Sequence, residues 1–255
     1  MSSTMLVLGP KLWVALAALT ATAAAVARIG RLGHGRQIVV AAVRAAAQLT
    51  AVSLLIAAIV ASLPATAGFV VLMCAVASGT AARRITSGTR GWWAAVPIVA
   101  GSLAVVAALL AAGLVPLRGI AIIPVAGILI GGAMTATSLA GRRALDEVTG
   151  RRGEVEAALA LGLSPRDAVL LVCRDAAAQA LIPALDQTRT VGLVTLPGAF
   201  VGVLLGGASP VEAGVTQLFV LVGLLAVEAV AVVITVELVA RGRLRPAEPI
   251  PALAG

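Results

Sequence analysis

The sequence predicts an all-α protein that crosses a lipid bilayer about seven times. Of its 255 residues, 60% are hydrophobic and only 12% are charged, whereas about a quarter of the residues in a typical soluble domain are charged. The mean hydropathy is +1.08. Several apolar runs are long enough to cross the membrane as helices, for which roughly 20 residues are needed. These observations together define a polytopic membrane protein.

Seven apolar segments follow one another along the chain, and they cover about 12–27, 38–62, 65–82, 92–115, 120–140, 191–205 and 213–240. Arginines gather after the first, third, fifth and seventh of them, and the other loops carry few. Positive residues stay on the cytoplasmic side of a membrane, so we expect the N-terminus outside and the C-terminus in the cytoplasm. Every loop agrees with this orientation, which favours seven spans over six or eight.

The net charge of +8 does not indicate a nucleic-acid partner. The arginines lie in short loops, where membrane topology places them, and the chain has too few aromatic residues to stack bases. Cys74 and Cys173 lie far apart and form no metal or redox motif. We therefore expect the lipid bilayer as a partner, no nucleic acid and no bound metal.

One long segment between the apolar runs, about 141–185, is densely charged, and we expect it to be a cytoplasmic coupling segment. Residues 156–162, EAALALG, predict a short helix that ends at Gly162. Ser164 predicts an N-cap for a second helix, and Pro165 fits its first helical position, where a missing N–H costs nothing. Two short helices with a glycine–proline break form a compact elbow, here residues 151–165, that a partner protein could grip.

Polar residues interrupt two of the predicted spans. Arg44 and Gln48 are four residues apart in the second span and so share one helix face. Glu228 lies midway along the last span. Charges inside a membrane are expensive and often functional, but Arg44 could instead extend to the headgroups. Glu228 could be a proton or cation site, or it could pair with Arg44.

Small residues recur at helical spacing in the fifth and sixth segments. The fifth contains Gly127 and Gly131, and the sixth contains Gly198, Gly202 and Gly206. Such spacing lets another helix approach closely. Two interpretations stay open: the glycines serve packing alone, or these two helices line a translocation path.

The sequence lacks the motifs of an enzyme. It has no phosphate-binding loop, its only lysine is Lys11, and its single histidine, His34, cannot build a hydrolytic centre by itself. If ATP drives this protein, another chain must hydrolyse it, and we expect no cofactor on this chain. We expect residues 1–245 to form one transmembrane domain and the proline-rich tail 246–255 to be disordered.

A family resemblance adds to these inferences. Glu156-Ala157-Ala158 followed by Gly162 is similar to the EAA loop of ABC-transporter permeases, whose short coupling helix docks in a groove of the ATP-binding subunit. Nearly the whole chain resembles the FetB family of permeases. The matching motifs are residues 43–45, 48–49, 123–127, 131–134, 159–162, 181–183, 190–198 and 206–207, with Pro210 and Gln217.

The resemblance implies a permease domain over 1–245 in the inner (plasma) membrane, working as a homodimer with a separate ATP-binding subunit that holds ATP and Mg. Bacterial relatives are linked to iron export, and plant relatives to aluminium tolerance. The residues implied to contact the ATP-binding subunit are Glu154, Glu156, Ala157, Leu159, Gly162, Ser164 and Pro165. Our candidates for the pathway are Arg44, Gln48, Met134 and Glu228.

The sequence departs from the family pattern at two places. Residues 131–134 are Gly-Gly-Ala-Met where relatives usually have Gly-Asn-Ala-Met, and residues 197–201 are Pro-Gly-Ala-Phe-Val where relatives usually have two methionines and a polar residue. These changes put iron as the cargo in doubt. The alternative to a permease subunit is a secondary transporter or channel in which Arg44 and Glu228 are the coupling or gating charges.

Overall fold

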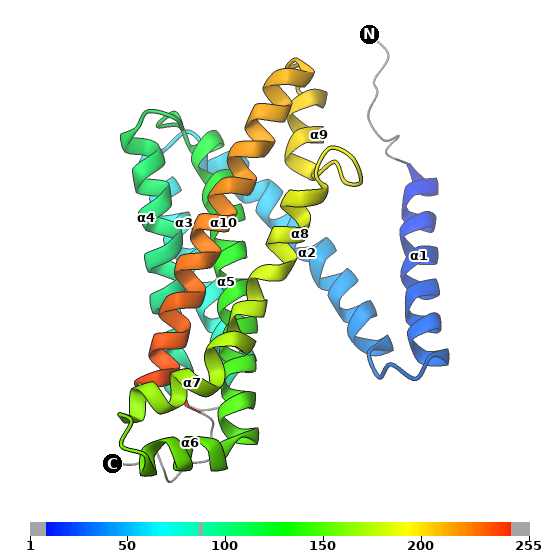
Figure 1. Ribbon diagram of the computed structural model, residues 1–255. Coiled ribbons are helices and arrows are strands. Elements are labelled where there is room, and N and C mark those ends of the chain that lie inside the picture. The colour runs from blue at the N-terminus through cyan, green and yellow to red at the C-terminus, as the bar shows by residue number, and fades with distance from the viewer. Residues whose placement is uncertain (1–8, 87–88, 246–255) are drawn as a thin grey trace. The chain divides into compact units, whose positions relative to one another are not determined.

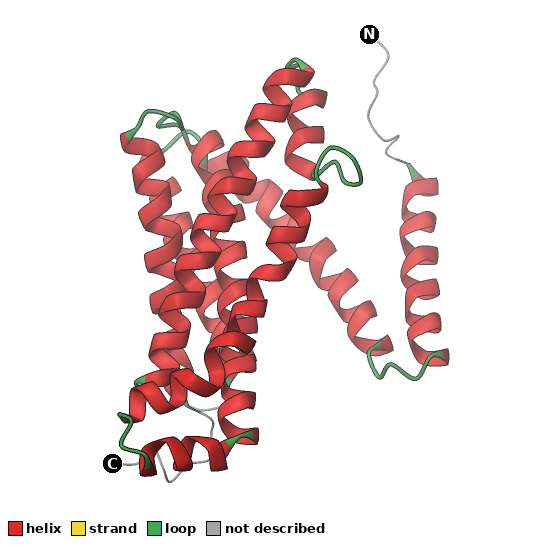
Figure 2. Ribbon diagram, viewed as in Figure 1, coloured by secondary structure: helices red, strands yellow, loops and turns green. Residues whose placement is uncertain are grey.

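The computed structural model describes residues 9–86 and 89–245. Within these ranges every named element is a helix, and the only extended pairing is an isolated bridge between Val191 and Thr195 (Figure 2). Seven helical segments in the described part are long and apolar enough to cross a membrane. The prediction of an all-α protein with about seven spans is confirmed. The predicted disordered tail, 246–255, lies outside the described residues.

The chain divides into two compact units, 1–61 and 62–255. The first consists of two helices, α1 (Pro10–Ile29) and α2 (Gly35–Ile59). They pack on each other, and a tight turn in which Arg31 and Gly33 have positive φ joins them. Only 6% of the residues in the apolar stretch of α1, and none in that of α2, are buried. These helices therefore offer nearly all of their surface to lipid or to a partner.

The second unit is a bundle around one central helix (Figure 1). That helix is α5 (Gly119–Gly150). It packs against α3 (Leu63–Ile85), α4 (Ala95–Ala111) and α10 (Pro210–Ala240), and also against α7 (Pro165–Ala178). Alanines recur at helical spacing on the buried face of α5, at positions 126, 133, 136, 140 and 144. Such small side chains let neighbouring helices approach closely. A short 3-10 helix, η1 (Thr89–Ala94), leads into α4.

The charged segment forms helices at the end of the bundle where α5 and α10 finish (Figure 1). α5 continues ten residues beyond the predicted span, to Gly150, and α6 (Arg152–Ala160) follows it directly. The chain then turns into α7 (Pro165–Ala178), which continues through η2 (Gln179–Leu181) and α8 (Ile182–Thr190). α7 packs against both α5 and α10.

The sixth predicted span, 191–205, is wrong. That range contains a turn and the eight-residue helix α9 (Gly198–Leu205), which is about 12 Å long at the usual rise per residue and too short to cross a hydrocarbon core of roughly 30 Å. The sixth helical segment long enough to cross is Pro165–Thr190. Pro197 at the N-cap of α9 and Gly192 in a positive-φ turn explain the break.

Candidate functional site

The elbow is built by local signals that the structure shows directly. α6 ends as the backbone N–H of Gly162 donates to the carbonyl of Leu159 at 3.0 Å and that of Leu163 donates to Ala158 at 3.1 Å. These two bonds form a Schellman C-cap, in which the residue directly after the C-cap adopts a left-handed backbone conformation. Gly162 supplies it with φ +91°. Glycine is favoured here because it has no side chain to oppose that conformation.

The second arm of the elbow begins at a side-chain cap. The hydroxyl oxygen of Ser164 accepts the backbone N–H of Asp167 at 3.1 Å, and the same hydroxyl donates to the Asp167 carboxylate at 2.6 Å. Pro165 occupies the start of α7. The N-cap and first-turn positions predicted for Ser164 and Pro165 are confirmed. The two caps fix the angle between α6 and α7 without support from a partner.

Ion pairs tie the elbow to the bundle. Arg151 lies 2.5 Å from Glu154 and 3.5 Å from Glu147 at the end of α5, and it donates to the Val172 carbonyl in α7 at 3.4 Å. This contact holds the pKa of Glu154 below its usual range, because the side-chain hydrogen bond from Arg151 favours the charged carboxylate. Arg151 thus connects three successive helices.

A second tie joins α7 to α10. The Nε and Nη2 atoms of Arg166 each donate to one carboxylate oxygen of Glu237 at 2.8 Å. The same carboxylate accepts a hydrogen bond from Arg241, the C-cap residue directly after α10. A forked guanidinium–carboxylate pair fixes orientation as well as distance. The first turn of α7 and the last turns of α10 are therefore held in register.

The elbow has a buried inner side and an exposed outer side. Val155 and Ala158 are buried, and Leu159 is half-buried. The predicted contact residues Glu154, Glu156, Ala157, Gly162, Ser164 and Pro165 are all exposed. Leu161 is 82% exposed at the tip between the arms. Sequence analysis did not single out Leu161, although a leucine directly before the cap glycine of a short charged helix was a visible signal.

The pathway candidates fall into both units. Arg44 and Gln48 are exposed on α2, in the first unit. Met134 and Glu228 belong to the second unit, where Met134 packs against the core and Glu228 is only 9% exposed. Within the second unit, the structure brings Glu228 against α5. Pairing of Arg44 with Glu228 stays a prediction.

Glu228 lies against the position where the family motif is altered. A Cβ atom added to Gly132 would stand 2.9 Å from the Oε1 atom of Glu228 and 2.5 Å from the Cδ2 atom of Leu224. Among the described residues, the Glu228 carboxylate has no hydrogen-bond or ion-pair partner. Because Gly132 has no side chain, the Glu228 carboxylate can occupy the space beside α5 at this position.

The glycines proposed for packing have different surroundings. A Cβ on Gly127 would stand 2.9 Å from the Cε atom of Met73 in α3, so those helices are close there. Gly131, Gly198 and Gly202 have open space instead, and Gly206 meets only its own helix. α9 is held to α10 by a different contact, in which the backbone N–H of Phe200 donates to the buried Gln217 side chain at 3.1 Å. A packing role for the α9 glycines stays a prediction.

This architecture is that of a multi-pass membrane protein with a capped helical elbow at one end of its bundle. A family model described as "Uncharacterised protein family (UPF0014)" matches residues 11–243, and the chain belongs to that family. The resemblance to the FetB family is thereby confirmed.

Three relatives illustrate the range of the family. The UPF0014 membrane protein STAR2 of rice is 38% identical over 82% of this chain and 74% of its own length. The protein ALUMINUM SENSITIVE 3 of Arabidopsis thaliana is 39% identical over 58% of this chain and 55% of its own length. The probable iron export permease protein FetB of Escherichia coli is 32% identical over 54% of each chain. No solved structure matches the chain.

Proposed function

We propose that this chain is the permease subunit of an ABC transporter in the inner (plasma) membrane. It works as a homodimer, and a separate ATP-binding subunit that holds ATP and Mg docks on the elbow. The observation that supports this most strongly is an exposed apolar tip, Leu161, on a base that two helix caps and two ion-pair clusters make rigid. An aromatic or aliphatic anchor with a polar rim is a common basis of binding interfaces.

The same geometry provides a route for movement. ATP-driven closure of the partner subunits would displace the tip, and the two arms would move with it because their caps fix the angle between them. Arg151 would pass the displacement to α5, and Arg166 would pass it to α10 through Glu237. Both helices reach the core of the bundle.

The proposed cargo is iron or another metal or solute, moved outward, as the printed name of the Escherichia coli relative suggests. The described residues contain no group of three or more His, Cys, Asp or Glu side chains that could hold a metal ion. In the proposed pathway Glu228 is the charged group inside the bundle. We propose that it contacts the cargo transiently.

The test is co-purification of the tagged chain from its own host in mild detergent. Leu161→Glu places a charge on the tip without touching a buried contact, and it should abolish recovery of an ATP-hydrolysing subunit. Leu117→Glu is the matched control, because Leu117 is 66% exposed in the loop before α5, at the opposite end of the bundle (Figure 1). Recovery of the same ATPase with both variants would contradict the proposed docking site.

A secondary transporter is the second candidate, and one observation favours it. The buried Glu228 carboxylate lacks a partner among the described residues, as expected of a group that exchanges a proton or cation. In that case Glu228→Gln should abolish transport in vesicles that contain the purified chain and an ion gradient but no ATP. Vesicles that transport only when ATP and an ATPase are present would exclude this candidate.

A further inference from the structure

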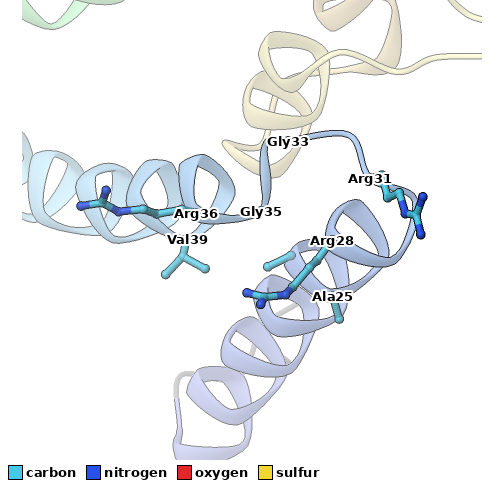
Figure 3. A pocket seen from close by; sticks show the side chains of 8 residues that line it. Ala25, Arg28, Arg31, Gly33, Gly35, Arg36 and Val39 are labelled. Atoms are coloured by element: carbon cyan, nitrogen blue, oxygen red, sulfur yellow. The ribbon is translucent and has the colours of Figure 1, made fainter.

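An open pocket with a volume of about 580 Å³ lies at the turn that joins α1 and α2 and is lined by residues of the turn and of both helices (Figure 3). Its lining combines the three arginines of this turn, Arg28, Arg31 and Arg36, with small apolar side chains such as Ala25 and Val39. Figure 3 shows Arg28 beneath the first turns of α2, near Val39, whereas Arg31 extends on the other side of the turn from Arg36. All three arginines thus line the pocket, with Arg28 directed toward Val39 and with Arg36 extending along α2 (Figure 3).

These arginines have no acidic partner in their own unit. Residues 1–61 contain five basic residues, namely Lys11, Arg28, Arg31, Arg36 and Arg44, and no aspartate or glutamate; the first acidic residue of the chain is Asp146. Among the described residues, no ion pair or side-chain hydrogen bond involves Arg28, Arg31 or Arg36. The elbow differs sharply, because Arg151, Arg152 and Arg166 all pair with carboxylates there.

The backbone of the turn adds to the positive potential. His34, the N-cap residue of α2, makes no side-chain hydrogen bond to the helix, so the N–H groups of the first turn lack a side-chain cap. A Cβ on Gly35 would stand 3.1 Å from the carbonyl oxygen of Ala24, so α2 begins in close contact with α1. Free N–H groups and the positive end of a 25-residue helix attract an anion. The pocket thus combines unpaired guanidinium groups with the backbone donors of the α2 N-terminus.

We propose that this pocket binds the phosphate-bearing headgroup of an anionic phospholipid. Guanidinium groups bind phosphate through paired hydrogen bonds, and basic pockets between membrane helices are suited to such headgroups. The neighbouring surface favours a lipid over free phosphate, since Ala25 and Val39 supply an apolar wall and both helices are almost entirely exposed. The headgroup lies against Arg28 and Arg36, and the acyl chains lie along α1 and α2.

Native mass spectrometry of the purified full chain tests this proposal. The probes are phosphatidylglycerol, phosphatidylcholine with the same acyl chains, and inorganic phosphate. The wild type should retain phosphatidylglycerol in preference to phosphatidylcholine. Arg28→Gln with Arg36→Gln should weaken that binding about fivefold for each arginine removed, the usual effect of one basic residue near an anionic surface. Arg28→Lys with Arg36→Lys keeps the charge, and so the topology, while it removes the paired hydrogen bonds.

The matched control is Arg83→Gln with Arg84→Gln, which removes two exposed arginines from the end of α3 and should leave phosphatidylglycerol binding within about twofold of wild type. Equal loss in the control and pocket variants, or equal binding of the two lipids, would overturn the proposal. Inorganic phosphate that binds alone and displaces phosphatidylglycerol at similar concentration would overturn the lipid assignment. Loss in the lysine variant as well would show that the guanidinium fork is required.

Discussion

Replacing Arg166 with glutamine should separate ATP hydrolysis from the movement of α10. Arg166 and Glu237 form a forked pair with both distances at 2.8 Å, and their side chains are 47% and 28% exposed. Exposed ion pairs as a class contribute only about 0–1 kcal/mol, so the forked geometry of this pair should fix orientation more than it adds stability. The fall in Tm should therefore be small, no more than a few degrees for a chain of this size.

Arg241→Gln is a matched control for this prediction. Arg241 binds the same Glu237 carboxylate, but it is the C-cap residue of α10 itself, so this pair does not join α10 to another helix. The two substitutions should cost similar stability in a thermal-shift assay in detergent. Only Arg166→Gln should lower cargo transport per ATP hydrolysed in vesicles that contain the assembled transporter.

The reasoning would be refuted if both variants coupled hydrolysis to transport as the wild type does, or if Arg241→Gln uncoupled it equally. A double-mutant cycle with Glu237→Gln adds a second check. The interaction energy between Glu237→Gln and Arg166→Gln should differ from zero, because the effects of substitutions at residues in contact are not additive. An interaction energy of zero would mean that the pair does not join α7 to α10 in solution.

Three further predictions concern the elbow and the α5–α10 interface. Gly162→Ala should destabilise the elbow by about 1–2 kcal/mol, because alanine opposes φ +91°, and hydrogen exchange at 158–165 should rise; unchanged exchange would exclude a capping role. Gly131→Ala should gain up to about 1 kcal/mol from helix propensity, whereas Gly132→Ala should lose that gain because it displaces Leu224 and Glu228; equal Tm values would contradict this packing. Arg151 lowers the pKa of Glu154, so the charged Glu154 fully stabilises the elbow at pH values above the ordinary glutamate pKa of about 4.3. This contribution is lost as the pH falls through the lowered pKa of the folded state. Protection from hydrogen exchange at 151–165, corrected for the intrinsic exchange rate at each pH, should therefore fall in acid for the wild type and change less for Glu154→Gln.

Local signals predicted the elbow well. The Gly162 break, the Ser164 cap and the first-turn proline each act within four residues, so their chemistry can be recognised in the chain alone. The exposed tip could not be predicted in the same way. The exposure of Leu161 depends on which face of α6 packs inward, and that is decided by the positions of α5 and α7.

The sixth span shows where sequence analysis failed. Residues 191–205 are more apolar than 165–190, so hydropathy favoured them. In the structure α7 packs between α5 and α10, and Arg166 at its start is neutralised by Glu237. A helix with a protein-facing side can carry polar residues that a lipid-facing helix cannot. Such a helix is recognised only once its neighbours are known.

The contact between Gly132 and Glu228 could not be predicted from the sequence either. Each residue was noted separately, one as a departure from a motif and the other as a charge within a span. Their proximity depends on the register of α5 against α10, which is set by side-chain packing along both helices. No local pattern in either helix encodes that register.

Cross-linking from the elbow tip tests the central claim most directly. Both native cysteines, Cys74 and Cys173, are buried, so Leu161→Cys introduces a single exposed thiol among the described residues. In native membranes, a thiol-reactive photo-cross-linker attached at position 161 should capture an ATP-binding subunit, and the same reagent at Leu117→Cys should not. Capture of no ATPase from position 161, or equal capture from both positions, would contradict the docking of an ATP-binding subunit on the elbow.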